Sequence, residues 1–114
     1  MRFEGQAAGY LRDRDLRLLK TNYRCRFGEI DLVMLDGETV CFIEVRFRKS
    51  LDFGGASASI TPAKQRKIVK TALFYLNSNR RLHNRPLRFD ALLIQQQEGG
   101  RLEYEWIQNA FYAE

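Results

Sequence analysis

The sequence predicts an α/β or α+β domain in which helices flank a central β-sheet of about five strands. Three observations lead to this prediction. Residues 39–48 alternate between two faces, as a half-buried strand does. Asp36-Gly37, just before them, is a strong signal for a tight hairpin. Thr61-Pro62 combines a helix N-cap residue with proline at the first helical position.

The other elements follow from local patterns. Residues 3–14 have helical apolar spacing, and residues 16–24 and 29–35 are expected to be strands that precede strand 39–48. Residues 49–60 are rich in Gly, Ser and Ala, which predicts a loop. The helix that begins at Thr61-Pro62 is expected to end near residues 77–79. Strands over 88–95 and 102–107 follow, and then a short C-terminal helix with Ala110 and Phe111; Asp90 is expected to salt-bridge or cap the sheet.

Length and composition are those of one domain, residues 1–114. Apolar residues make up 45% of the chain, and no apolar run approaches the ~20 residues that cross a bilayer. The N-terminus lacks the apolar segment of a signal peptide, so we expect a cytoplasmic protein without a membrane partner. Cys25 and Cys41 are then expected to be free thiols. With His83 as the only histidine we expect no zinc, and no organic cofactor either.

Positive charge is concentrated in the middle of the chain. The net charge is +5, but residues 46–90 carry 11 basic side chains against two acidic ones, Asp52 and Asp90. Such a block is typical of a surface that faces a polyanion such as nucleic acid. The alternative is that these are ordinary solvated charges of helices and loops.

Four charged residues are expected on one face of the first hairpin. If Asp36-Gly37 are its two central residues, Asp31 lies opposite Phe42 and Glu29 lies opposite Glu44. Asp31 and Glu44 are then diagonal neighbours on the face that also carries Arg46. Because clustered carboxylates repel one another, a divalent cation such as Mg²⁺ would stabilise the group. The alternative is a polar sheet face on which arginines 24, 26 or 46 pair with the acids.

Seven stretches together resemble a known family. They are FEGQAAGYL (3–11), NYRCRFGEIDLV (22–33), FIEVRFRKS (42–50), FGG (53–55), ITPAKQRKI (60–68), RFDALLI (88–94) and WIQNAF (106–111). In this order they resemble the YraN-like family of bacterial proteins. That family belongs to the restriction-endonuclease-like fold and is related to archaeal Holliday-junction resolvases. The resemblance implies a mixed central sheet with flanking helices and a nuclease-like site.

The resemblance also implies roles for individual residues. The active-site pattern of such nucleases is Asp followed by Glu-x-Lys, which Asp31 and Glu44 match. Where the lysine is expected the chain has Arg46, which can hold phosphate but cannot act as a base. Lys64 falls at a recurrent lysine of the family and is a possible substitute. Further expected metal ligands are Glu4, Glu29 and the carbonyl of Val45.

These assignments lead to three functional hypotheses. The first is an Mg²⁺- or Mn²⁺-dependent nuclease that acts on branched or otherwise structured DNA. The second is a nucleic-acid-binding protein with reduced or lost catalysis, and the third is a protein-interaction adaptor in DNA uptake or repair. Related resolvases are symmetric dimers, so a homodimer is a possibility. The residues expected to contact the DNA backbone are Arg48, Lys49, Lys67, Lys70, Arg80, Arg81 and Arg85.

Overall fold

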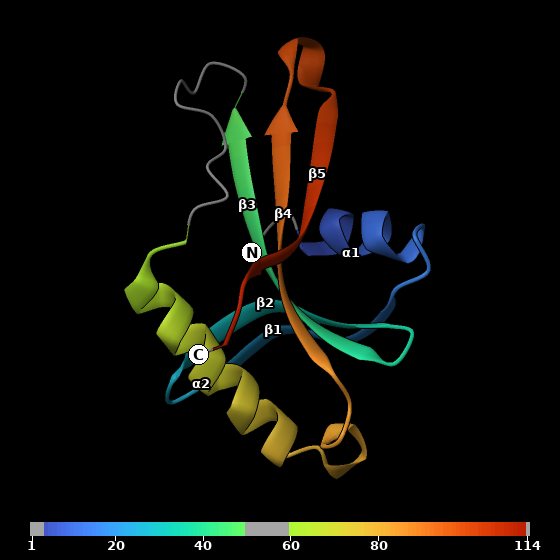
Figure 1. Ribbon diagram of the computed structural model, residues 1–114. Coiled ribbons are helices and arrows are strands. Elements are labelled where there is room, and N and C mark those ends of the chain that lie inside the picture. The colour runs from blue at the N-terminus through green and yellow to red at the C-terminus, as the bar shows by residue number, and fades with distance from the viewer. Residues whose placement is uncertain (1–3, 50–59, 114) are drawn as a thin grey trace.

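The computed structural model describes residues 4–49 and 60–113, which form a five-stranded mixed sheet with two α-helices (Figure 1). The elements are α1 (Glu4–Arg12), β1 (Arg17–Cys25), β2 (Gly28–Asp36), β3 (Thr39–Lys49), α2 (Pro62–Asn77), β4 (Leu87–Gln96) and β5 (Leu102–Phe111), with 3-10 turns at Arg80–Leu82 and Glu98–Gly100. The strands lie in the order β1-β2-β3-β4-β5, and β3–β4 is parallel whereas the other pairs are antiparallel. The predicted α/β fold is confirmed, and it is compatible with a restriction-endonuclease-like fold.

The two helices cover opposite faces of the sheet. Ala72 and Tyr75 of α2 pack with Phe42 and Phe89 on one face, whereas Leu11 of α1 belongs to a second core on the other face. Residues 40–45 of β3 are therefore buried whichever way their side chains point. Glu44 is one of them, so the central strand carries a carboxylate into a largely apolar layer.

Helix α2 begins where the sequence predicts. Thr61 is the N-cap, and its hydroxyl oxygen accepts a hydrogen bond from the Lys64 amide at 3.2 Å. Pro62 occupies the first helical position, where the missing amide hydrogen would have had no partner. The N-cap fixes the first turn of the helix, and that turn carries the Lys64 side chain.

The first hairpin differs in register from the prediction. Its central residues are Gly37 and Glu38, so Leu35 pairs with Val40. Gly37 has φ 61° and takes the first central position of the loop, which favours glycine. The predicted pairings of Asp31 with Phe42 and of Glu29 with Glu44 are therefore wrong. The register is displaced by two residues, and because side chains alternate with a period of two, Asp31 and Glu44 still share a face.

The C-terminal segment is strand and not helix. β5 continues to Phe111, which pairs with Phe89 and stacks on its ring with centroids 4.9 Å apart. The predicted short helix with Ala110 and Phe111 is therefore wrong. The local pattern does not reveal that Phe111 completes the core under α2, and burial of an aromatic ring outweighs weak local propensity.

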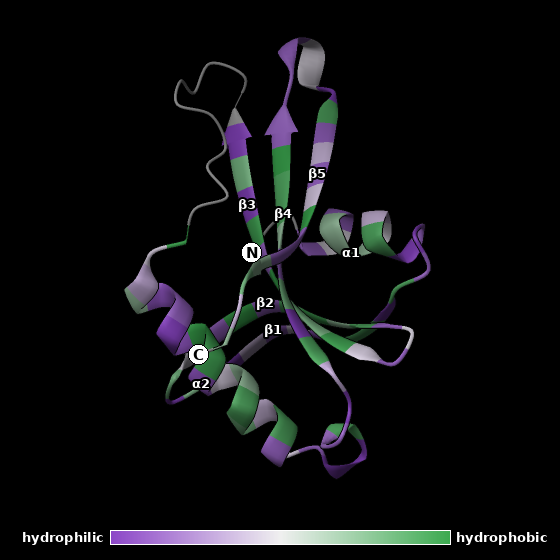
Figure 2. Ribbon diagram, viewed as in Figure 1, coloured by the Kyte–Doolittle hydropathy of each residue, from purple (hydrophilic) through white to green (hydrophobic). Residues whose placement is uncertain are grey.

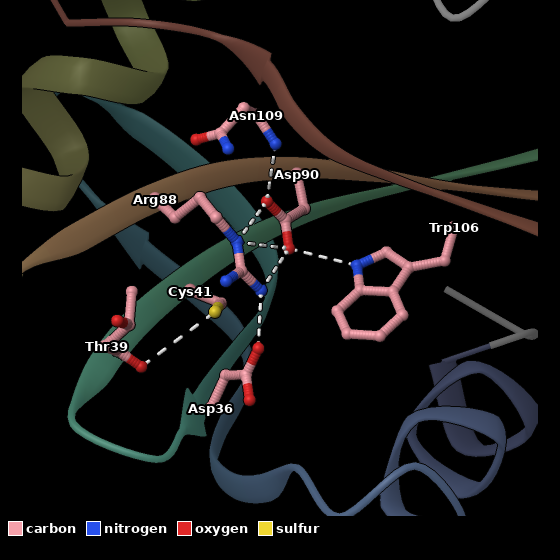
Figure 3. Close-up of polar contacts among 7 residues, drawn as sticks. All are labelled: Asp36, Thr39, Cys41, Arg88, Asp90, Trp106 and Asn109. Carbon is pink, nitrogen blue, oxygen red and sulfur yellow. Dashed lines mark hydrogen bonds and ion pairs between the residues drawn. The ribbon is translucent and has the colours of Figure 1, made fainter.

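A buried polar network joins β4 to β5 (Figure 3). The Asp90 side chain is fully buried and accepts hydrogen bonds from Arg88, from the indole of Trp106 at 2.9 Å and from the Asn109 amide at 3.1 Å. Arg88 also bonds to Asp36 at 3.0 Å. Burial by itself would lower the pKa of Arg88, but the hydrogen bonds and the charge of Asp90 outweigh burial and raise this pKa. The predicted structural role of Asp90 is confirmed.

Both cysteines are free, as expected. Burial, followed by the nearby charge of Asp90, raises the pKa of the Cys41 thiol to about 12, so this thiol stays protonated at neutral pH. No helix within the described residues is long and apolar enough to cross a membrane.

Candidate active site

Two acidic residues lie where strands β2 and β3 separate. The paired residues of these strands run from Asp36–Thr39 to Leu32–Ile43. Beyond that point β2 pairs with β1, and β3 pairs with β4. The next residue on each strand is an acid, Asp31 on β2 and Glu44 on β3. We call this place the β2/β3 fork.

Asp31 fills the fork with its side chain. Its Oδ2 accepts a hydrogen bond from the backbone amide of Val45 at 2.8 Å, in place of a backbone carbonyl of β2. The N–H and C=O of one strand residue point toward the same neighbouring strand. The Val45 carbonyl therefore also faces the fork, on the side of Asp31.

Glu44 is paired with a lysine from the helix above it. Its side chain is only 7% exposed, and Lys64 Nζ lies 2.7 Å from its Oε2. A buried carboxylate without a partner would be strongly destabilising, so the ammonium group compensates this charge. Lys64 thus reaches Glu44 from α2, a contact that the sequence left open, and its part as a substitute for the expected lysine stays a prediction.

The electrostatics of Asp31 indicate a crowded acidic site. Burial, then the charge of Glu44, raises the pKa of Asp31 to about 7, although the hydrogen bond from Val45 acts in the opposite direction. A hydrogen bond with Glu44 and the charge of Glu4 on α1 raise it further. Glu4 is itself buried. Acids from α1, β2 and β3 thus influence one another at the fork, where a hard cation could replace the proton.

This repulsion predicts how stability depends on pH. The pKa of Asp31 is about 7 in the folded protein, above its ordinary value of 3.8. Its destabilising effect is therefore absent below about pH 4, grows between pH 4 and 7, and is complete above pH 7. We expect Asp31→Asn to raise the free energy of unfolding at pH 8 by about 1–2 kcal/mol, since partial exposure screens the charge.

Urea unfolding in a chelator at pH 8 and at pH 3.5 checks this prediction. At pH 3.5 the variant and the parent protein should have the same stability, because Asp31 is then protonated in the parent. A variant that is less stable than the parent at pH 8 would contradict the argument.

The donors at the fork suit magnesium or manganese in chemical type. Mg²⁺ is usually held by one or two carboxylates together with water and phosphate oxygens. Asp31, Glu44 and the Val45 carbonyl provide such oxygens, and Glu4 lies near enough to affect Asp31. Within residues 4–49 and 60–113, no three His, Cys, Asp or Glu side chains form a ready-made metal cluster. Lys64 contacts Oε2 of Glu44, so Oε1 is the oxygen of that carboxylate that the ion pair does not engage.

Two other predicted site residues form no ion pair with Asp31 or Glu44 in the described part of the chain. Glu29 pairs with Arg24, with Nε–Oε2 3.0 Å, and both side chains are more than half exposed. The predicted alternative in which arginines pair the acids therefore holds for Glu29. Arg46 is half-buried on β3, and no ion pair involves it in the part of the chain that the structure describes. The cation that contacts the candidate active site is Lys64.

Five of the seven predicted DNA-contacting residues form two groups, one at each end of α2, and the other two lie at the end of β3. Lys67 and Lys70 are exposed on the N-terminal half of α2, which is mostly hydrophilic in Figure 2. Arg80 and Arg81 are exposed beyond the other end of the helix, and Arg85 pairs there with Glu38 at 3.4 Å. Arg48 donates a hydrogen bond to the Phe47 carbonyl, and the Lys49 side chain lies outside the described residues.

A further basic residue, Arg17, was not predicted. It lies at the start of β1 and lines a cavity with the arginines that follow α2. The sequence carries no signal for this neighbourhood, because Arg17 and Arg80 come together only through the packing of α2 on the sheet.

Comparison with known proteins assigns the family. The model of the Uncharacterised protein family UPF0102 matches residues 3–94. A UPF0102 protein from Nitrosomonas eutropha is 56% identical over 108 residues, 95% of this chain and 88% of that protein. One from Psychromonas ingrahamii is 53% identical over 95% of this chain and 84% of that protein. One from Pseudomonas fluorescens is 44% identical over 95% of this chain and 88% of that protein. The predicted YraN-like membership is confirmed, and the chain belongs to the UPF0102 family.

Proposed function

We propose that the protein is a metal-dependent nuclease that hydrolyses phosphodiester bonds in structured or branched DNA. The observation that carries the proposal is the β2/β3 fork, where a buried Glu44 and Asp31 lie together beneath Lys64. Two carboxylates beside a lysine ammonium are the groups that metal-assisted phosphoryl chemistry uses. The fold is compatible with the restriction-endonuclease-like affiliation, which is part of the proposal.

In this proposal Asp31, Glu44 and the Val45 carbonyl hold Mg²⁺ or Mn²⁺, helped by Glu4. A bound divalent ion supplies Lewis-acid activation of a phosphate oxygen and of water. The carboxylates fix its place at the fork, and the Val45 hydrogen bond fixes the orientation of Asp31. Glu29 is left out of the ligand set because it is exposed and paired with Arg24.

Lys64 takes the part that the family pattern gives to a lysine two residues after the glutamate. Its ammonium group is held at Glu44 by a contact of 2.7 Å. From this place the ammonium group would hold a phosphate oxygen of the substrate if Glu44 served as a metal ligand. Arg46, at the expected lysine position, adds positive charge on the same strand face but cannot exchange a proton.

Cleavage of single-stranded, flapped and four-way DNA with Mg²⁺ or Mn²⁺ tests the proposal. We expect metal-dependent cleavage that Asp31→Asn and Glu44→Gln each reduce about a hundredfold or more. Glu29→Gln is the matched control, because it removes an acid from the same strand outside the fork. Cleavage that persists at parental rates in both fork variants would overturn the assignment.

One observation favours the second hypothesis, DNA binding without cleavage. Lys64 already compensates the charge of Glu44 without a metal. On this hypothesis DNA binds with an affinity that falls steeply with salt, and no metal restores cleavage. Absence of DNA binding at low salt would leave the adaptor hypothesis. A cytoplasmic location and a homodimer stay predictions, the latter checked by light scattering.

A further inference from the structure

A second cationic site lies at the opposite end of α2 from Lys64. It is a cavity of about 520 Å³ lined by four arginines, which we call the arginine pocket. Arg17 comes from the start of β1, Arg80 and Arg81 from the 3-10 turn, and Arg85 from the segment before β4. Figure 2 shows hydrophilic residues along much of the segment that connects α2 to β4. The remaining lining is neutral: Leu19, Leu35, Tyr75, Ser78, Asn79 and Leu82.

The charges of the arginine pocket are poorly compensated. Arg85 pairs with Glu38 at 3.4 Å, and the Glu38 side chain is 84% exposed. Glu38 and Asp15 line a neighbouring hollow that shares Arg17 and Arg85 with the pocket, so four cations face two acids. No ion pair involves Arg17, Arg80 or Arg81 within residues 4–49 and 60–113. Guanidinium groups gathered from three segments without matching acids create a positive potential that attracts anions.

The chemistry of this lining suits phosphate in particular. Guanidinium groups bind phosphate oxygens through two parallel hydrogen bonds. Ser78 and Asn79, at the C-terminal end of α2, line the same wall, but their side chains donate to the Phe74 and Tyr75 carbonyls, so the arginines supply the donors for an anion. A cavity of this size accommodates a phosphate with its sugar. An ordinary surface arginine, in contrast, is surrounded by solvent and lines no such cavity.

A row of side chains connects the pocket to the candidate active site. Lys67 lies over Gly28, and the Phe74 ring meets the Phe27 ring edge-on at 5.7 Å. The Arg26 guanidinium lies 4.9 Å from the Phe27 ring centroid, which places another cation on this border. The exposed Lys67 and Phe74 therefore lie on one side of α2, beside the turn between β1 and β2, with the fully buried Thr71 between them.

The spacing of the two sites matches several nucleotides. Lys64 and Ser78 are 14 positions apart on one helix, which corresponds to about 21 Å at 1.5 Å per residue. Phosphates of one DNA strand are spaced about 3.4 Å apart along the duplex axis. The interval is thus on the order of six base pairs. One strand winds more than half-way round the duplex over that rise, at about 10 base pairs per turn, so the two sites would contact phosphates of opposite strands.

We propose that the arginine pocket binds a backbone phosphate of the nucleic acid, about six base pairs from the phosphate at the β2/β3 fork. The spacing part of this inference rests on the proposed function, because it takes the fork as the place of the reacting phosphate. The pocket then orients a DNA arm along α2. It supplies affinity independent of sequence, since it faces the backbone and not the bases.

The test compares two double variants that each remove two exposed arginines. Arg80→Ala/Arg81→Ala removes charge from the pocket, and Arg12→Ala/Arg101→Ala removes equal charge elsewhere. Binding to a 20-base-pair duplex is measured by fluorescence anisotropy in a chelator, so that no cleavage occurs. We expect the pocket variant to bind about tenfold more weakly, with a salt slope lower by about 2, and the control variant to stay within about twofold of the parent.

Each other outcome overturns part of the inference. Equal losses in both variants would show a general charge effect, and no loss in either would remove the pocket from DNA binding. Thermal stabilisation by inorganic phosphate that is lost in the pocket variant, with DNA affinity unchanged, would assign the pocket to a free phosphate. If the parent never cleaves DNA but the pocket variant loses binding, the pocket stands and the nuclease proposal falls. If Asp31-dependent cleavage occurs and the pocket variant binds normally, only the pocket proposal falls.

Discussion

Replacing Lys64 with methionine is expected to lower metal-dependent cleavage about a hundredfold or more, whereas Arg46→Met should cost less than about tenfold. The reason is position. Lys64 places its ammonium group 2.7 Å from Glu44, at the fork. Arg46 lies two residues beyond Glu44 and has no ion pair with any described acid. The cation that contacts the carboxylate is the one expected to stabilise charge on the reacting phosphate.

The same variants distinguish a chemical role of Lys64 from a structural one. Lys64→Met also leaves Glu44 buried without its cation, which is expected to lower stability at pH 8. Lys64→Arg keeps the charge, so it should restore stability but only part of the cleavage rate, because guanidinium and ammonium differ in shape. Cleavage rates are therefore measured at a temperature well below the thermal unfolding midpoint of each variant. A larger loss in Arg46→Met than in Lys64→Met would reverse the assignment.

The pairing of Asp31 with Glu44 shows which parts of the site a sequence can predict. Alternation along β2 and β3 places both acids on one face, and that result holds although the hairpin register is displaced by two residues. The register itself depends on whether Asp36-Gly37 or Gly37-Glu38 form the loop. These two turns differ only in local conformational energy, which the pattern of polar and apolar residues does not reveal. Glu29 illustrates the consequence, because β2 no longer pairs with β3 at this residue, and the separate pairing of β2 with β1 sets it beside Arg24.

Contacts between distant segments were harder to predict. The N-cap at Thr61 fixes Lys64 in the first turn of α2, and the sequence predicts this part. That the turn lies above Glu44 depends on how α2 packs on the sheet, which local patterns do not encode. The same packing brings Arg17 to Arg80. The C-terminal helix was mispredicted for a related reason, since Phe111 is held in a strand by packing against Phe89.

Loss of the Asp90 carboxylate is the largest stability effect that we expect. Asp90→Ala should lower the free energy of unfolding by about 3–5 kcal/mol, because it removes one partner of a buried ion pair. Arg88, whose side chain is only 13% exposed, would keep Asp36 as its partner. The Trp106 indole and the Asn109 amide would lose their acceptor altogether.

The control is Asp36→Ala, which removes the outer partner of the same arginine. Asp36 has a side chain that is 36% exposed, so this change should cost about 1 kcal/mol. Unfolding is followed by far-UV circular dichroism, because Trp106 contacts Asp90 directly and its fluorescence would change for local reasons. Equal effects of the two variants would contradict the central place of Asp90 in the network.

A double-mutant cycle then separates the ion pair from the rest of the network. Arg88→Met/Asp90→Ala should be less destabilised than the sum of its two single variants, because removing both partners leaves no buried charge uncompensated. The remaining loss measures what Trp106 and Asn109 contribute through the same carboxylate. Asp90 and Glu44 are both buried acids of this sheet. Asp90 accepts hydrogen bonds from three residues, whereas Glu44 is paired with one lysine whose side chain is 52% exposed. This difference is why we assign Asp90 to stability and propose a chemical role for Glu44.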